Sequence, residues 1–147
     1  MKKLAVIFIC FGLASCYFGA NESGRRIANN FYLVGWDEEN WKIVFSTNAD
    51  NIYAPEKIIV NHDVFALGNN DNFIIAKQHP CENKKSHIID LDSLKPNKEI
   101  TNYYIIDIRD KVYKIYSFDN AKDFKEKRTD LRVPISLSYS FYDRKLE

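Results

Sequence analysis

The stretch that decides the fold is VFALGNNDNFIIAK, residues 64–77. Two apolar runs, 64–68 and 73–77, flank a polar run, 69–72, made of asparagine and aspartate. These residue types tolerate the left-handed backbone conformations of tight turns, and short apolar runs bounded by them are typical of strands. The stretch therefore predicts an antiparallel β-hairpin.

Similar aromatic and β-branched runs recur on both sides of this hairpin. They are separated by polar loops, of which 37–40 and 95–98 are the clearest. The runs predict further strands at 30–36, 41–47, 57–60, 87–91, 103–108 and 112–118.

Near the C-terminal end the pattern predicts one helix and a final strand. Asn120 can cap a helix over residues 120–132, with Asp123 three positions later in an approximate capping box, and Pro134 ends it. After that proline, serines alternate with Ile135, Leu137, Tyr139 and Phe141, which predicts a strand with one buried face and one wet face. The expected fold class is α+β: a mainly antiparallel sheet, or one that curls toward a barrel, with a single helix.

The first residues resemble a bacterial export signal. Lys2 and Lys3 precede about ten mostly apolar residues, fewer than the roughly 17–25 that span a bilayer. Residues 13–16, Leu-Ala-Ser-Cys, resemble a lipobox, the recognition sequence of bacterial lipoproteins. The resemblance implies cleavage after Ser15 and a diacylglycerol on the Cys16 sulfur, so that acyl chains hold the protein on a membrane. An ordinary secretory signal and an uncleaved membrane helix are the alternatives.

The chain accordingly divides into three parts: a signal peptide at 1–15, a lipidated tether at 16–29 and a single α+β domain at 30–147. The tether is expected to be flexible because residues 17–29 are rich in small and polar residues without a clear period. The 132 residues that follow the signal suit one domain.

Charge and cysteine content narrow the function classes. Without the signal, 19 basic residues balance 20 acidic ones, whereas nucleic-acid binding favours a basic face; no nucleic acid is expected as a partner. The sequence also has no polybasic run for anionic lipids. With Cys10 removed and Cys16 lipidated, Cys81 is the remaining thiol, so no internal disulfide is expected.

Two segments carry a family resemblance. One is the stretch 64–80, the hairpin followed by Gln-His-Pro; the other joins 103–107 to the helix around 123–128 and to Val133-Pro134. Together with the lipobox they resemble small bacterial lipoproteins that carry the domain of unknown function 3997, over roughly residues 30–135. In that family a Gly-Pro turn usually precedes the helix, where this chain has Ser117-Phe118. The resemblance implies location and fold, and it brings no functional residues.

Candidate chemistry is sparse. His79, Cys81 and His87 are residue types that bind zinc or copper, but their spacing matches no standard signature, and the favoured interpretation is an exposed polar loop with an incidental thiol. Two pairs of carboxylates stand close in the sequence, Asp90 with Asp92 and Asp107 with Asp110. Paired carboxylates can act as general acid and general base. There is no Gly-x-Ser-x-Gly elbow and no phosphate-binding glycine loop. No catalytic residue, cofactor or metal is therefore expected.

The aromatic run 30–36 leaves two alternatives open. Phe31 and Leu33 point one way, while Tyr32, Val34 and Trp36 point the other. Either both faces are buried, or one is an exposed aromatic surface of the kind enriched in binding hot spots. Core packing is favoured because aromatic side chains dominate small β cores.

These observations favour a membrane-anchored envelope lipoprotein on the extracytoplasmic side of the cell membrane or outer membrane. Its domain is expected to be no enzyme but a module that binds another macromolecule, such as an envelope protein. A small-ligand carrier is the alternative, followed by a small hydrolase. A shallow aromatic patch would favour the binding module, and a deep apolar pocket would favour the small-ligand carrier. A pocket with a shifted carboxylate or histidine pKa would favour the hydrolase.

Replacing Cys16 with serine removes the sulfur that the lipobox makes the lipid acceptor. We expect Cys16→Ser to abolish incorporation of labelled fatty acid and to leave the full-length precursor, whereas Cys10→Ser should leave both labelling and cleavage intact. Metabolic labelling and the mass of the product measure both effects. If Cys16→Ser were labelled as strongly as the unchanged protein, Cys16 would not be the lipid acceptor.

Overall fold

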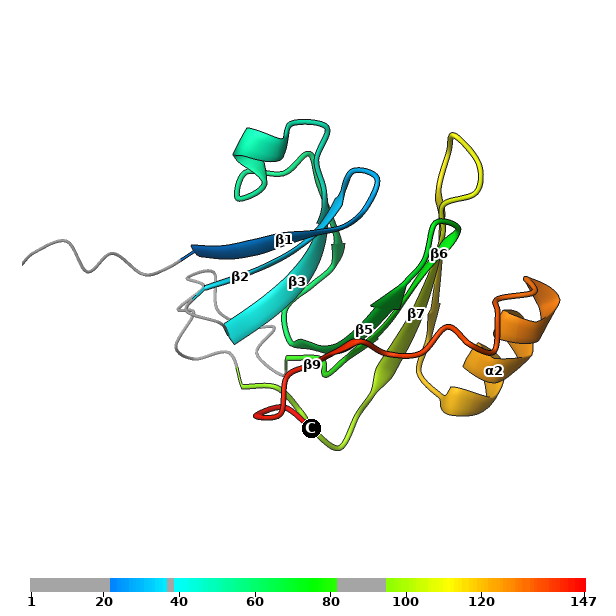
Figure 1. Ribbon diagram of the computed structural model, residues 1–147. Helices are drawn as coiled ribbons and strands as arrows, with labels where there is room; N and C mark the ends of the chain where they lie inside the picture. Colours follow the sequence, from blue (N-terminus) through cyan, green and yellow to red (C-terminus); the bar gives the residue numbers. More distant parts are fainter. Residues whose placement is uncertain (1–21, 37–38, 82–94) are drawn as a thin grey trace, which may run out of the picture.

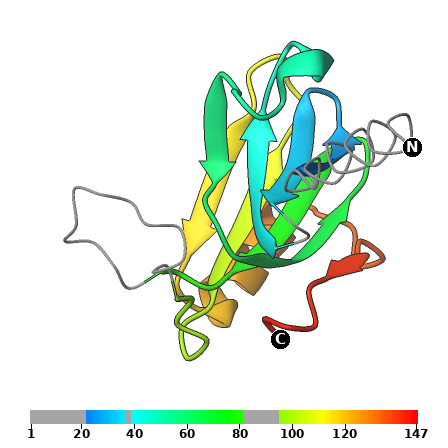
Figure 2. The same cartoon turned by 90° about the vertical axis from the view of Figure 1, so that its left-hand side faces the viewer.

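Two antiparallel sheets and one helix make up the fold in a computed structural model that describes residues 22–36, 39–81 and 95–147 (Figures 1 and 2). The first sheet has the order β1-β2-β3-β4, with β1 (Glu22–Ala28), β2 (Phe31–Trp36), β3 (Glu39–Phe45) and β4 (Lys57–Val60); the 3-10 helix η1 (Ala49–Asn51) precedes β4. The second has the order β8-β7-β6-β5-β9, with β5 (Val64–Asn69), β6 (Phe73–Gln78), β7 (Asn102–Asp107), β8 (Lys114–Phe118) and β9 (Phe141–Tyr142); α2 (Ala121–Asp130) follows β8. The predicted α+β class is confirmed, and the sheets do not close into a barrel.

The main core lies between the two sheets, which face each other in Figure 1 and overlap in the view of Figure 2. Leu33 and Ile43, which pair across β2 and β3, are fully buried there against Leu67, Ile74 and other residues of the second sheet. Burial of such side chains stabilises a fold by about 1.5–3 kcal/mol each. This layer therefore holds the sheets together.

Outer layers cover both sheets. On the second sheet, Ile75 and Ile105 pack against Phe124 of α2, on the face opposite the main core. On the first sheet, Tyr32 and Val34 are buried beside Ile52 and Tyr53 from the loop around η1, and Phe31 and Leu33 lie in the main core. Residues 31–34 are thus buried on both faces, as the core-packing alternative expected.

Local signals placed the central hairpin and the helix correctly. The side-chain oxygen of Asn70 accepts hydrogen bonds from the backbone N–H groups of Asn72 (2.9 Å) and Phe73 (2.8 Å), which closes the turn between β5 and β6. The side-chain oxygen of Asn120 accepts from the Asp123 N–H at 2.9 Å, which caps α2. Both features are confirmed. In the described ranges no helix has the length and apolar character needed to cross a membrane.

The tether prediction is wrong from Glu22 onward. Residues Glu22–Ala28 form β1, which pairs with β2 over its whole length, from Glu22 opposite Trp36 to Ala28 opposite Phe31. The strand lacks an apolar period because β1 is the edge of its sheet and Arg25 and Arg26 are exposed. The loop prediction 37–40 is also too long, since β3 begins at Glu39; the strand predicted at 87–91 lies outside the described residues.

The predicted final strand is mostly absent. Only Phe141–Tyr142 pairs as β9, and Ile135, expected in the core, is fully exposed. Leu137 is buried, but its N–H bonds the Pro134 carbonyl (3.0 Å) in a turn rather than in a sheet. The Arg128 side chain donates to the Pro134 and Leu137 carbonyls, at 3.0 and 2.9 Å, so an arginine of α2 holds this segment.

The segment then crosses β5 in close contact with Gly68. A Cβ built on Gly68 would lie 2.0 Å from the carbonyl oxygen of Ser138. Any side chain at this position would push the two backbones apart. Gly68 is therefore required for its lack of a side chain.

Gly68→Ala and Gly24→Ala make a matched pair. At Gly24 the nearest obstacle to a Cβ is the Cδ1 end of Ile52 at 2.5 Å, a side chain that can move. We expect Gly68→Ala to lower the free energy of unfolding by about 1–3 kcal/mol or more, as overpacking does, and Gly24→Ala to cost less. Urea denaturation of both variants measures this, and equal small losses would contradict the close crossing at Gly68.

Candidate functional site

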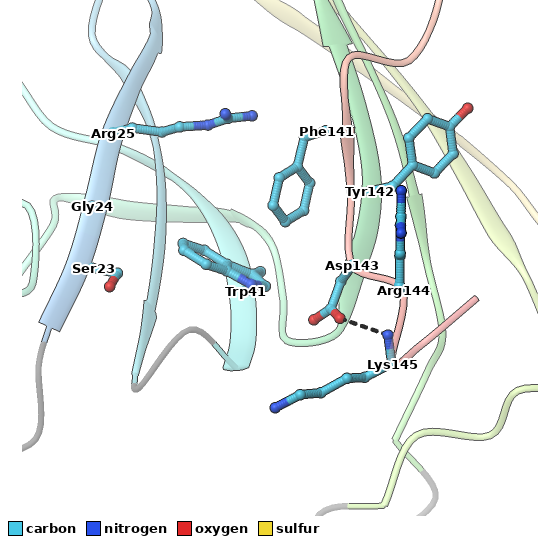
Figure 3. A pocket seen from close by; sticks show the side chains of 9 residues that line it. All are labelled: Ser23, Gly24, Arg25, Trp41, Phe141, Tyr142, Asp143, Arg144 and Lys145. Carbon is cyan, nitrogen blue, oxygen red and sulfur yellow. Dashed lines mark hydrogen bonds between the residues drawn. The ribbon is translucent and has the colours of Figure 1, made fainter.

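A hollow of about 480 Å³ opens to solvent at the edge of the two sheets where β1 and β9 lie (Figure 3). Three consecutive residues of β1, one residue of β3 and five residues from β9 onward line it. They are Ser23, Gly24, Arg25, Trp41, Phe141, Tyr142, Asp143, Arg144 and Lys145. The two ends of the described chain thus meet in one place.

The floor of the hollow is aromatic and joins both sheets. The ring centroids of Trp41 and Phe141 are 5.4 Å apart in an edge-to-face arrangement at 72°. The guanidinium carbon of Arg25 lies 4.9 Å from the Phe141 ring centroid, a cation–π contact, and Figure 3 shows Arg25 reaching from β1 toward that ring. Phe141 is therefore packed between an aromatic and a cationic side chain of the first sheet.

Backbone hydrogen bonds hold the wall formed by the C-terminal residues. Phe141 pairs with Leu67 and Tyr142 with Ala66 across β9 and β5. The N–H of Asp143 donates to the Phe65 carbonyl at 2.7 Å. The wall is thus an extension of the second sheet rather than a loose tail.

His79 connects the C-terminal wall of the hollow to the loop at Ile100. Its ring is buried, stacks on Phe65 with centroids 4.2 Å apart, and places Nδ1 2.7 Å from the Ile100 carbonyl oxygen and Nε2 2.9 Å from that of Leu146. Lys98 adds a hydrogen bond from Nζ to the Lys145 carbonyl. Because both imidazole nitrogens face carbonyl oxygens, His79 serves as a structural clamp and has no nitrogen directed toward a metal.

Cys81 has a structural contact as well. Its thiol donates to a carboxylate oxygen of Asp63 at 2.7 Å, and Asp63 is buried. Burial, and then the hydrogen bond and charge of Asp63, raise the pKa of the thiol to about 12. The interpretation of Cys81 as an incidental thiol in an exposed loop is wrong, and a protonated thiol is a poor nucleophile and ligand.

The structure does not assemble the predicted metal candidates. His79 and Cys81 have the contacts just described, and His87 lies outside the described residues. Within the described parts of the chain, no three His, Cys, Asp or Glu side chains are grouped so as to hold a metal ion.

The carboxylate pairs do not form an acid–base site. Asp107 is buried and bonded by the Arg109 guanidinium at 2.6 and 2.9 Å, which holds the pKa of its carboxyl below the usual range. Asp110 is exposed and pairs with Lys114 at 3.3 Å. Arg109 also lies over the Phe73 ring, 4.7 Å from its centroid. This ion pair thus stabilises the end of β7. Asp90 and Asp92 lie outside the described residues.

The hollow carries more positive than negative charge. Arg25, Arg144 and Lys145 bring three cationic side chains to its lining, and Asp143 brings one carboxylate, which accepts a hydrogen bond from the Lys145 N–H at 3.0 Å. A rim of this kind beside an aromatic floor can hold a negatively charged group attached to an apolar one. The sequence did not reveal it, because Arg25 stands 119 positions before Arg144.

A second hollow of about 490 Å³ lies between α2 and the segment that follows it. It is lined by Lys125, Arg128, Thr129, Arg132, Val133, Pro134 and Ile135. This hollow is cationic too, but no aromatic residue lines it. The aromatic floor therefore distinguishes the hollow beside β1.

The comparisons with known proteins give one match. The sequence profile of a family described as "Protein of unknown function (DUF3997)" matches residues 28–144. No curated protein and no solved structure matches the chain.

Cys81 variants test the contact with Asp63. Cys81→Ser keeps a donor and should change stability little, whereas Cys81→Ala leaves a buried carboxylate without that donor and should cost about 1–3 kcal/mol. With a pKa of about 12, the thiol should be alkylated slowly at neutral pH, since only the thiolate reacts. Asp63→Asn should accelerate alkylation, although only in part, because burial is the larger cause. Mass spectrometry of the peptide containing residue 81 follows the rate; fast alkylation of the unmodified sequence would contradict the assignment.

Proposed function

The chain belongs to the DUF3997 family, and we propose that it is a non-catalytic binding module held on a bacterial envelope membrane by a lipid on Cys16. The binding site is the hollow formed by β1, β3 and the residues from β9 onward. The domain faces the extracytoplasmic side of the cell membrane or outer membrane. This function rests on the lipobox for its location and on the hollow for its activity.

The observation that supports binding is the meeting of an aromatic floor with a cationic rim. Trp41 and Phe141 present ring surface, Arg25 lies over the Phe141 ring (Figure 3), and Arg144 also lines the hollow. Aromatic and arginine side chains supply most of the energy in binding hot spots. Both sheets contribute, so the site needs the complete fold.

Binding is favoured over catalysis by the location of the perturbed groups. A site for acid–base or nucleophilic chemistry would contain residues whose pKa values are shifted toward their task. In the described part of the chain, shifted pKa values belong to Cys81, Tyr104, Asp107, Arg109 and Tyr139. None of these residues lines the hollow.

The shape of the hollow favours a large ligand over an enclosed small molecule. Carrier pockets bury most of the surface of their ligand, whereas this hollow is open and its rim residue Tyr142 is 45% exposed. A ligand seated on the aromatic floor would extend beyond the rim. We therefore infer a macromolecule or an extended surface as the ligand.

Site-specific photo-crosslinking in intact cells tests the function. A photoreactive amino acid in place of Tyr142, at the rim, should give a specific adduct, while one in place of Val112, which is 75% exposed beyond β7, should not. Adding Arg144→Glu should reduce the Tyr142 adduct severalfold. The same adducts at both positions, or none at either, would contradict a binding site in the hollow.

A further inference from the structure

We propose that the ligand of this hollow is the phosphate-bearing headgroup of an anionic phospholipid in the same membrane that anchors the chain. This inference rests on the proposed function and specifies the ligand. It has three supports: the distance to the anchor, the charge of the rim and the type of the aromatic residues.

The distance to the anchor is short. Only five residues, 17–21, lie between Cys16 and Glu22, where β1 begins, and the fully extended chain from residue 16 to residue 22 spans at most about 20 Å. Ser23, Gly24 and Arg25 come next and line the hollow. The β1 side of the hollow must therefore lie within a short distance of the lipid headgroups.

Nothing in the connecting sequence opposes this position. Residues 17–21 read Tyr-Phe-Gly-Ala-Asn and carry no charge. The other cationic hollow is lined by residues of α2 and of the segment after it, and α2 lies on the far side of the domain from β1 in Figure 1. The anchor thus brings the aromatic hollow, and not the one at α2, toward the membrane.

The rim has the charge that phosphate requires. Arg25 and Arg144 carry planar guanidinium groups, which bind phosphate oxygens through two parallel hydrogen bonds. Lys145 adds a third cationic residue to the lining. Although the whole chain is almost neutral, folding concentrates positive charge here, and anionic leaflets attract such clusters.

The floor has the residue types of a membrane interface. Tryptophan and tyrosine are enriched at the level of the headgroups, where their rings meet both polar and apolar parts of the lipid. Trp41 and Phe141 form the ring surface, and Tyr142 is at the rim. A phosphate at Arg25, which lies over the Phe141 ring, would leave the glycerol and first methylenes of the lipid against these rings.

The test uses the full lipidated protein reconstituted in two kinds of vesicle, one of phosphatidylcholine alone and one with a one-third share of phosphatidylglycerol. Amide hydrogen exchange is measured by mass spectrometry. We expect exchange at residues 23–25 and 141–145 to slow severalfold in the anionic vesicles only. Peptides from β6 should not change and serve as the control for folding.

Variants separate this site from general attraction to charge. Arg25→Glu and Arg144→Glu should abolish the slowing, and Lys125→Glu, the same charge change in the α2 hollow, should leave it in place. If the charge reversals change exchange in the β6 peptides, Arg25→Gln and Arg144→Gln are used in their place. These neutral variants should weaken the slowing of exchange. Soluble glycerol phosphate added to phosphatidylcholine vesicles should have no effect.

Three results would overturn the inference: equal exchange in both vesicles, equal loss with Lys125→Glu, or full slowing with soluble glycerol phosphate. The last would assign the hollow to a free phosphate ester. If the vesicles had no effect while crosslinking at Tyr142 gave a protein adduct, the binding module would remain and the lipid ligand would be wrong. Absence of both would remove the proposed function as well.

Discussion

The backbone of residue 138 lies directly on Gly68, and the arrangement of the C-terminal third of the domain depends on this contact. A Cβ at Gly68 would be 2.0 Å from the Ser138 carbonyl oxygen. The close approach lets the chain pass from the face of the second sheet that α2 covers to the edge of β5, where β9 pairs. Phe141 then meets Trp41 across the gap between the sheets. A side chain at Gly68 would displace the segment that leads to the wall of the hollow.

Sequence reasoning succeeded where the signals were local. The β5–β6 hairpin is fixed by Asn70, which bonds residues two and three positions away, and α2 is fixed by Asn120 in the same manner. It failed at β1, where an exposed edge strand with two adjacent arginines has no apolar period. It failed again beyond Pro134: Leu137 is buried as expected, but through a crossing over β5 that no alternation of residues encodes. The hollow could not be predicted, because it needs the pairing of segments from opposite ends of the domain.

The polar residues that were candidates for metal binding or catalysis mainly form hydrogen bonds that connect distant segments. His79 links the loop at Ile100 to Leu146, and Cys81 bonds Asp63. Gln78 behaves likewise: its amide nitrogen donates to the His62 carbonyl at 2.9 Å, and its oxygen accepts from the Tyr104 hydroxyl at 2.9 Å. Buried polar groups need such partners, since an unpaired one costs about 1–3 kcal/mol. A histidine or cysteine in a chain of this kind is therefore weak evidence for a site until its contacts are known.

The pairing of β9 with β5 also has a kinetic consequence. Phe141 and Leu67 are 74 positions apart, and closing a loop of that length costs more entropy than forming a hairpin. Only two residue pairs, Phe141 with Leu67 and Tyr142 with Ala66, form within the strand and offset this loss of entropy. Since an exported chain also emerges N-terminal end first from the membrane it crosses, both sheets can assemble up to β8 before residues 141 and 142 emerge. The hollow is thus expected to be among the last parts of the domain to form, and among the first to open when the protein is stressed.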